Sequence, residues 1–299
     1  MGRSRVLVTG GTGFLGAYLL ERLAKRYEVH AGLRHGKLPP FASPFPLELR
    51  DKASIEAARR LAPRYVVHNA ALTYPDVCED DPDAAHAVNV DGTRMLAEAV
   101  RGSCIHFIYC STDLVFDGTR PESSETATPT PLMVYGRTKL AGEAVARAVL
   151  GDRVVVARLA LLYGQGRGRS AGRTFTERTL EEARQGRAVR LFRDQFRSPL
   201  YVEDAAAGIA AILTWPDPPA VVHLGGPERI SRFEMGVETL AVFGLDRSLA
   251  IPVSMEDVPF RVPRPRDVSF DIRRARSMGF DPLPVGKGLL AMRDASRHD

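Results

Sequence analysis

Short apolar runs alternate with longer amphipathic stretches over the first half of the chain. The apolar runs predict buried strands at Arg5–Thr9, Val29–Leu33, Tyr65–Asn69, Ile105–Ser111 and Val154–Leu159. Apolar residues spaced three and four apart predict helices at Phe14–Arg26, Ser54–Leu61, Ala84–Val100 and Val134–Val149. Because strands joined by helices pair in parallel, this alternation predicts an α/β fold with a Rossmann-type, doubly wound parallel sheet.

The alternation weakens after Leu159. Two proline-rich stretches, Pro39–Pro46 and Pro121–Pro131, predict surface loops. The second half contains a Gly/Arg-rich segment (164–172), a charged helix (175–186), a Pro/Arg-rich stretch (253–266), a helix at 201–214 and a strand at 221–224. We therefore expect a dinucleotide-binding domain at 1–163, to which 199–224 returns, and a smaller C-terminal substrate-binding lobe formed by 164–198 and 225–299.

A glycine-rich turn joins the first strand to the first helix. Gly10, Gly13 and Gly16 bring backbone N–H groups and a helix N-terminus to a position where no Cβ blocks a pyrophosphate. Three glycines can also form an ordinary loop, but the strand before them and the helix after them favour dinucleotide binding. We expect the cofactor to contact these glycines together with Thr12, Phe14 and Leu15.

The end of the second strand is basic. An NAD site usually has an acidic residue there, whereas this chain has Arg34, His35 and Lys37. Cations favour the 2′-phosphate of NADP(H), with Arg34 as its contact, and NAD(H) as the less favoured cofactor. The alternative is an exposed basic turn. Glu48 and Leu49 follow a possible third strand and are expected beside the adenine, although Glu48 could also be an ordinary surface residue.

Tyr135 and Lys139 lie four residues apart on one face of a predicted helix. An ammonium near the phenol would lower its pKa, so that Tyr135 could exchange a proton with an alkoxide. Thr112, at the end of the preceding strand, could hydrogen-bond the reacting carbonyl. A Ser/Thr turn and a helix cap at Asp113 are the structural alternatives.

These motifs together resemble the extended short-chain dehydrogenases/reductases. The chain carries TGGTGFLG at 9–16, HNAALT at 68–73, NVDGT at 89–93, STDLVFDG at 111–118 and YGRTK at 135–139, and within that superfamily it is most similar to dTDP-4-dehydrorhamnose reductases. The resemblance implies NADPH-dependent reduction of a ketone, with Tyr135 as the acid. It also implies that Ala70 and Ala71 lie beside the cofactor, and that Asn89 kinks its helix and holds a proton-relay water.

The second lobe is expected to bind a nucleotide-sugar. Arg197 and Arg264 resemble arginines that contact the diphosphate in nucleotide-sugar enzymes, but both could form surface ion pairs. Thr73 and Asp113 are also expected to contact the substrate. Rhamnose-type reductases typically carry a tryptophan where this chain has 158–163, and its only Trp is at 215. The identity of the sugar therefore stays open.

Three functions other than a reductase are alternatives for this combination of motifs. A 4,6-dehydratase should have an acidic residue after Thr112-Asp113, where this chain has Leu114. A 4-epimerase needs tightly held NAD, which the basic turn disfavours. The methionine adenosyltransferase beta subunit resembles the same subfamily and acts as a non-catalytic NADP-binding regulator, but Asn89, Thr112, Tyr135 and Lys139 are all retained here.

Composition excludes few functions. The net charge is +5, and the basic residues are scattered, so nucleic acid is not expected as a partner. Three cysteines form no CxxC and the histidines form no HxxxH or HxH, which predicts no metal site, and Cys104 and Cys110 should be buried thiols. No apolar run could span a membrane and no signal peptide is expected, so we expect a cytoplasmic protein, with a homodimer as a candidate assembly.

Overall fold

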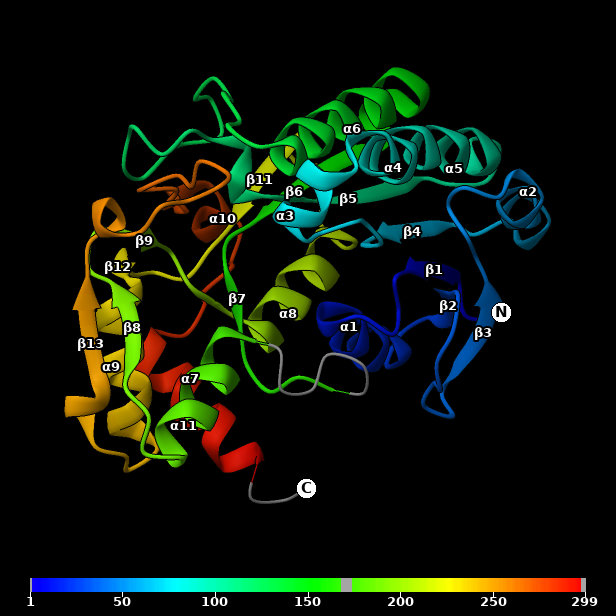
Figure 1. Ribbon diagram of the computed structural model, residues 1–299. Helices are drawn as coiled ribbons and strands as arrows, with labels where there is room; N and C mark the ends of the chain where they lie inside the picture. Colours follow the sequence, from blue (N-terminus) through cyan, green and yellow to red (C-terminus); the bar gives the residue numbers. More distant parts are fainter. Residues whose placement is uncertain (1, 168–173, 297–299) are drawn as a thin grey trace.

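A seven-stranded parallel sheet forms the centre of the computed structural model, which describes residues 2–167 and 174–296 (Figure 1). The strand order is β11-β6-β5-β4-β1-β2-β3. The strands are β1 (Arg5–Thr9), β2 (Glu28–Leu33), β3 (Ala42–Pro46), β4 (Tyr65–His68), β5 (His106–Thr112), β6 (Val154–Leu159) and β11 (Val221–Leu224). The order reverses between β1 and β4, and in doubly wound sheets ligands bind at the carboxyl ends of the strands beside such a reversal.

Helices cover both faces of the sheet. On one face lie α1 (Phe14–Ala24) and α8 (Val202–Ile212), and on the other lie α2 (Lys52–Leu61), α5 (Gly92–Val100) and α6 (Val134–Leu150). Alternate residues of each strand point to opposite faces, so Val6 and Val8 join the core under α1 while Leu7 joins the core under α5. Both faces are apolar, which explains why the strands appear as continuous apolar runs in the sequence.

The strand β3 corrects one sequence expectation. Residues 42–46 were expected in a loop because of their prolines, but they pair in parallel with β2. The strand lies at the edge of the sheet, so the missing N–H groups of Pro44 and Pro46 face no second neighbour. The stretch from Pro121 to Pro131 is irregular apart from an isolated bridge at Ser123, as expected.

The helix expected at 84–100 is divided into three parts. It begins as α4 (Pro82–His86), widens to a π-helical turn, η1 (Ala87–Asp91), and continues as α5. A further short helix, α3 (Pro75–Asp80), precedes it. The wide turn inserts an extra residue into the helical ladder, and such bulges occur frequently at functional sites.

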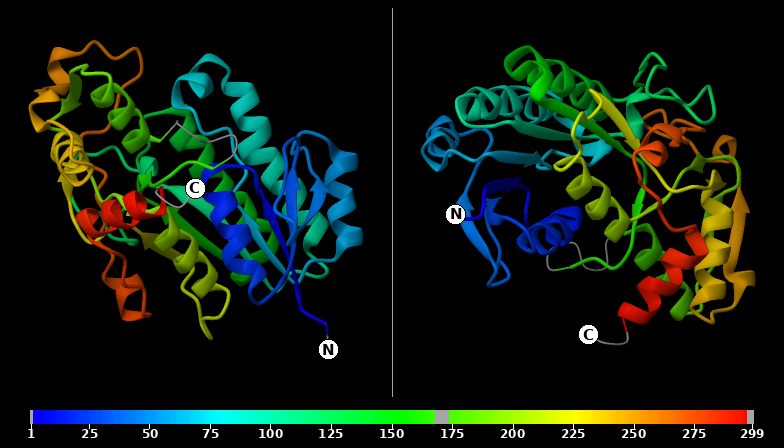
Figure 2. Two further views of the ribbon diagram at one scale, coloured as in Figure 1. Left: turned by 90° about the horizontal axis from the view of Figure 1, so that it is seen from below. Right: turned by 180° about the vertical axis from the view of Figure 1, so that it is seen from behind.

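The remaining elements lie together beside one end of the sheet. In Figures 1 and 2 the orange strand and the red C-terminal helix lie far from the blue strands β2 and β3. The longer elements are α7 (Phe175–Arg184), β8 (Val189–Phe192), α9 (Arg232–Val242), β13 (Ala250–Val253) and α11 (Val285–Ala295). The shorter ones are β7 (Leu162–Tyr163), β9 (Phe196–Arg197), β10 (Leu200–Tyr201), β12 (Ile230–Ser231), α10 (Arg273–Ser277) and two 3₁₀ turns, at Arg247–Leu249 and Met255–Asp257. Two other 3₁₀ turns of the described residues belong to the sheet: Asp113–Val115 follows β5, and Gly151–Arg153 joins α6 to β6. Part of the Gly/Arg-rich segment, 168–173, lies outside the described residues.

The chain passes between the sheet and these outer elements more than once. After α7 and β8 it returns to place α8 against α1 and β11 against β6. One apolar cluster continues from Leu19 and Ile209 to Met235 and Leu289. The outer elements therefore share a core with the sheet.

Candidate active site

A cavity of about 860 Å³ opens at the carboxyl ends of the strands, where the sheet order reverses. The residues expected from the sequence that line it are Gly10, Thr12, Gly13, Phe14, Leu15, Arg34, Glu48, Leu49, Ala70, Ala71, Thr73, Thr112, Asp113, Tyr135 and Lys139. The cavity thus brings the glycine-rich turn and the Tyr/Lys pair into one space.

The glycine-rich turn is shaped by close backbone packing. Gly10 has φ +67°, and a Cβ there would lie 3.0 Å from Cα of Ala70. A Cβ on Gly16 would overlap the carbonyl oxygen of Gly10, which explains why Gly16 supports the turn without lining the cavity. Gly13 caps α1 without a side chain, and the first turn of α1 has no acidic residue. Free N–H groups and the positive end of the helix dipole therefore fit a pyrophosphate.

Arg34 and Glu48 form one unit at the far end of the cavity. Arg34 Nη1 donates to Glu48 Oε2 at 3.1 Å, and the Arg50 amide donates to Glu48 Oε1 at 3.1 Å. Burial acts to raise the pKa of Glu48, but these two hydrogen bonds outweigh it and the pKa is lowered. Both carboxylate oxygens are engaged, while the Arg34 side chain is 63% exposed and free to meet an anion.

Tyr135 lies in the first turn of α6, and its phenol shares a hydrogen bond with the Thr112 side chain. Thr112 Oγ1 also donates to Asp113 Oδ1 at 3.1 Å and accepts from the Leu114 amide at 3.2 Å. Thr112 therefore caps the 3₁₀ turn at 113–115 while standing beside the phenol. The structural and the chemical interpretations of Thr112 are compatible.

The pKa of Tyr135 differs from the sequence expectation. Burial raises the pKa of the phenol well above its usual range, and the charge of Asp113 raises it further, outweighing the hydrogen bond between the phenol and Thr112. Burial also lowers the pKa of Lys139 to about 8, and its Nζ lies 4.0 Å above the Tyr109 ring. The expectation that the ammonium depresses the phenol pKa is wrong here. Tyr135 is protonated at neutral pH.

Comparison with known proteins identifies the family. The family model described as RmlD substrate binding domain matches residues 4–294. The chain belongs to this family. It is 31% identical to the methionine adenosyltransferase 2 subunit beta of Bos taurus, over 94% of this chain and 85% of that protein. It is also 31% identical to a dTDP-4-dehydrorhamnose reductase of Streptomyces griseus, over 94% of this chain and 90% of that one.

A solved structure agrees with this membership. The NADP complex of a dTDP-4-dehydrorhamnose reductase from Bacillus anthracis superimposes with a TM-score of 0.85 and 26% identity, covering 98% of this chain and 99% of that one. The Rossmann-type fold and the resemblance to extended short-chain dehydrogenases/reductases are confirmed. The RmlD-family chain thus belongs among NAD(P)-dependent oxidoreductases.

Asn89 of this RmlD-family chain lies in the π-helical turn, next to the cavity rather than in its lining. Its amide group is fully engaged: Oδ1 accepts from the Leu72 amide at 2.8 Å, and Nδ2 donates to the Leu72 carbonyl at 3.1 Å and to Thr138 Oγ1 at 3.0 Å. Asn89 therefore fixes the wide turn against the start of α6. Its role in holding a water stays a prediction.

His68 belongs to the same region and was not singled out from the sequence. Thr9 Oγ1 accepts from the Ala70 amide at 2.9 Å and lies 2.8 Å from His68 Nδ1, while His68 Nε2 lies 3.0 Å from Thr93 Oγ1. Thr93 donates to the Asn89 carbonyl at 2.8 Å. Burial lowers the pKa of His68 to about 3, so the ring is neutral. The signal in the sequence was a histidine inside the HNAALT motif.

The two arginines expected at the substrate of this RmlD-family chain lie near the cavity but outside its lining. Arg197 donates to the carbonyls of Phe196, Pro265 and Arg266, and Arg264 pairs with Asp76 at 2.7 Å. Neither is among the described residues that line the cavity. Besides Arg34, three other arginines line it: Arg50, whose amide donates to Glu48, and Arg178 and Arg232 from the outer elements. Sequence reasoning missed them because they belong to no motif.

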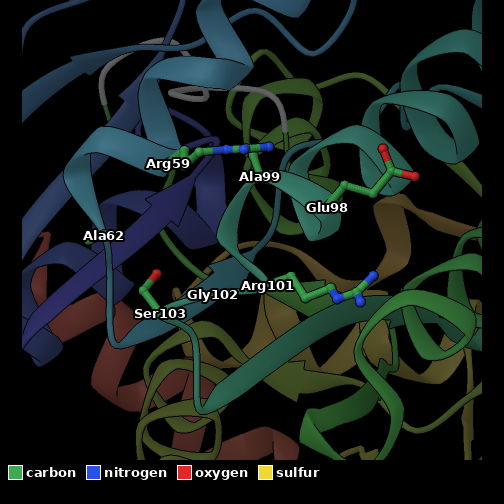
Figure 3. Close-up of a pocket in the computed structure, with 7 residues that line it drawn as sticks. All are labelled: Arg59, Ala62, Glu98, Ala99, Arg101, Gly102 and Ser103. Atoms are coloured by element: carbon green, nitrogen blue, oxygen red, sulfur yellow. The ribbon is translucent and has the colours of Figure 1, made fainter.

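A second hollow, of about 600 Å³, lies where α2 and α5 end (Figure 3). It is lined by Arg59, Ala62, Glu98, Ala99, Arg101, Gly102 and Ser103, none of which belongs to the motifs above. Among the described residues there is no group of three or more His, Cys, Asp or Glu side chains arranged to hold a metal. No helix in the described part of the chain is long and apolar enough to cross a membrane.

Proposed function

We propose that this RmlD-family chain is an NADPH-dependent reductase of a ketone carried on an activated sugar, with Tyr135 as the general acid. The observation that supports this most strongly is the single cavity that joins the glycine-rich turn to Thr112, Tyr135 and Lys139. Membership in a family with dTDP-4-dehydrorhamnose reductases supports the same chemistry.

The cofactor side of the cavity suits NADP(H). The pyrophosphate would lie against the N-terminus of α1 and the turn at Gly10–Gly13, and Arg34 would meet the 2′-phosphate. Ala70, Ala71 and Leu49 would flank the bound molecule, and Lys139 would hold the nicotinamide ribose. The bound NADPH supplies a hydride. In this assignment 1–163 and 199–224 hold the cofactor, while 164–198 and 225–299 hold the substrate.

The protein residues supply the proton and the positioning. Thr112, by turning its hydroxyl proton from Asp113 Oδ1 to the substrate, would donate a hydrogen bond to the carbonyl oxygen. Tyr135 gives its phenolic proton to that oxygen as the alcohol forms. A raised phenol pKa suits this role because it keeps the proton on Tyr135 until the oxygen becomes strongly basic. Asn89 and Thr138 hold the start of α6, and hence Tyr135, in place.

The substrate side differs from the rhamnose-type pattern. Where a tryptophan is typical, Ala160, Leu161 and Leu162 line the cavity. Aliphatic side chains cannot stack on a sugar ring as an indole does. We therefore propose an activated keto-sugar as the substrate class and leave the sugar unspecified.

The test begins with binding of NADPH and NADH to the purified protein by fluorescence, followed by addition of a dTDP-4-keto-6-deoxy sugar. Selective NADPH binding with oxidation on sugar addition is expected, and Tyr135→Phe should bind NADPH but fail to oxidise it. Oxidation at the wild-type rate by Tyr135→Phe would overturn the assignment of the acid.

The 31% identity to methionine adenosyltransferase 2 subunit beta favours a second candidate function, a non-catalytic NADP-binding regulatory subunit. Under that function NADPH binds without oxidation on any keto-sugar, and a stoichiometric protein partner co-purifies. Loss of turnover in Tyr135→Phe would refute it.

A further inference from the structure

The Arg232 guanidinium is held in the cavity wall with part of its hydrogen-bonding capacity unused. Arg232 is the first residue of α9 and lines the cavity, and its Cζ lies 4.4 Å over the Phe175 ring. Its Nε donates to Gln195 Oε1 at 3.4 Å, while Nη1 is buried with no hydrogen-bond partner among the described residues. An orphaned, buried guanidinium donor is unfavourable until an acceptor arrives.

The charges around Arg232 favour an anion as that acceptor. Burial and the positive charges of Arg197 and Arg178 together lower the pKa of Arg232 to about 9. Asp113 is the only negative charge that acts on Arg232 in this part of the described structure, and it is also near Arg197. Asp267 also acts on Arg197, but it is paired with Arg229 at 2.6 Å. Arg178, Arg197 and Arg232 therefore outweigh Asp113, and the net charge here is positive.

Asp113 itself is 5% exposed and lines the same cavity. Its Oδ1 accepts from Thr112, and the backbone amide of Leu161 also acts on the carboxylate, but Oδ2 has no partner in the described part of the chain with full hydrogen-bond geometry. Burial raises its pKa, although Arg197 and Arg232 act in the opposite direction. A hydroxyl of the ligand could donate to Oδ2 while the anionic group meets the arginines.

Arg197 and Arg264, which the resemblance associates with the diphosphate, are engaged in hydrogen bonds or ion pairs within the protein. Arg197 donates hydrogen bonds to three backbone carbonyls. Arg264 is paired with Asp76 and contacts Met133 Sδ. By contrast, Arg178 lies on the exposed surface of α7 and lines the cavity. Arg178 is therefore an exposed cation of the cavity lining, and Arg232 is a buried one.

We propose that Arg178 and Arg232 bind the diphosphate group of the substrate in this chain, in place of Arg197 and Arg264. A guanidinium can donate two parallel hydrogen bonds to phosphate oxygens, and the stacking of Arg232 on Phe175 fixes its plane in advance. This inference specifies the substrate of the proposed reductase as a nucleoside-diphosphate sugar and so rests on that function, but it concerns binding and is tested without turnover.

The experiment is calorimetric titration of the full-length protein with dTDP and, separately, with inorganic pyrophosphate, in the absence of NADPH. Arg232→Gln and Arg178→Gln are each expected to weaken dTDP binding about 10-fold or more, because a charge-assisted hydrogen bond is lost. Arg184→Gln, on the same helix but exposed and outside the cavity lining, is the matched control and should change affinity less than about 2-fold. Asp113→Asn should tighten dTDP binding, because it removes a negative charge beside the anion.

Three outcomes would overturn the inference. The first is a larger loss of dTDP affinity in Arg264→Gln than in Arg232→Gln. The second is an equal loss in Arg232→Gln and Arg184→Gln. The third is binding that excess NADP⁺ displaces and Arg232→Gln leaves intact, since that pattern places the diphosphate at the glycine-rich turn. Arg232→Lys, which keeps the charge, and melting temperatures for each variant separate lost binding from lost folding. If dTDP binding depends on Arg232 but no keto-sugar is reduced, the binding site stands and the reductase fails.

Discussion

Replacing Lys139 by methionine should stabilise the protein while abolishing reduction of the substrate. Lys139 is 2% exposed, and the charge of Glu143 offsets the effect of this burial only in part. Its pKa falls from 10.5 to about 8, chiefly through burial. Since one pKa unit corresponds to about 1.4 kcal/mol, the ionised side chain lowers the free energy of unfolding by about 3 kcal/mol.

The destabilisation by Lys139 depends on pH because the folded and the unfolded chain lose the lysine proton at different pH values. Below about pH 8 Lys139 is protonated in both the folded and the unfolded chain, so the destabilisation is complete. As the pH rises from about 8 to 10.5, the folded protein loses the proton first and the destabilisation disappears. Methionine has a similar length and no charge, but it forgoes the contact of the ammonium with the Tyr109 ring, worth about 0.5–2 kcal/mol. The expected net gain at pH 7 is about 1–3 kcal/mol.

Urea denaturation of wild type and Lys139→Met near pH 7 and near pH 10 measures the effect. The difference in unfolding free energy should be large at the lower pH and small at the higher one. Lys287→Met, at an exposed position of α11, serves as the control and should show neither change. Equal stability of Lys139→Met and wild type at pH 7, or a gain that persists at high pH, would refute the reasoning.

Three further outcomes follow from the site. Tyr135→Phe should lower kcat about 100-fold or more while leaving NADPH affinity nearly unchanged, measured by steady-state kinetics and fluorescence titration; comparable rates would remove Tyr135 from the mechanism. Arg34→Asp should weaken NADPH far more than NADH, because it places a carboxylate beside Glu48 where the 2′-phosphate would lie; equal losses would contradict this. Glu143→Gln should lower the free energy of unfolding by about 3–5 kcal/mol, because its partner Arg158, 2.9 Å away, is 5% exposed and would be left charged and unpaired; an unchanged denaturation midpoint would show otherwise.

The fold could be predicted because its signals are local. The strands and helices from Arg5 to Leu159 follow apolar periodicity, and their alternation implies the parallel sheet. The edge strand β3 was expected in a proline-rich loop, although Glu48 and Leu49 were also placed after a possible third strand. Its prolines disfavour a central strand, and only tertiary pairing shows that it lies at an edge. The π-helical turn at 87–91 was missed as an element because its apolar spacing matches that of an ordinary helix, although the resemblance pointed to a kink at Asn89.

The site could be predicted only where motifs carry it. The glycine-rich turn, Thr112, Tyr135 and Lys139 do line one cavity. Their electrostatics could not be predicted, because the spacing of Tyr135 and Lys139 reveals neither the burial of both nor the nearby Asp113. Arg178 and Arg232 could not be found at all, since α7 and α9, which carry them, are far apart in the sequence and come together only in the folded chain.

The route of the chain between the sheet and the outer elements has a consequence for cooperativity. Strand β11 and helix α8 are encoded after α7 and β8, yet they cover β6 and α1. A fragment ending near residue 163 would leave apolar faces of α1 and β6 uncovered, and is expected to aggregate or to be degraded rather than fold. The intact chain should melt in one transition, and limited proteolysis should yield no stable piece that contains only the first half.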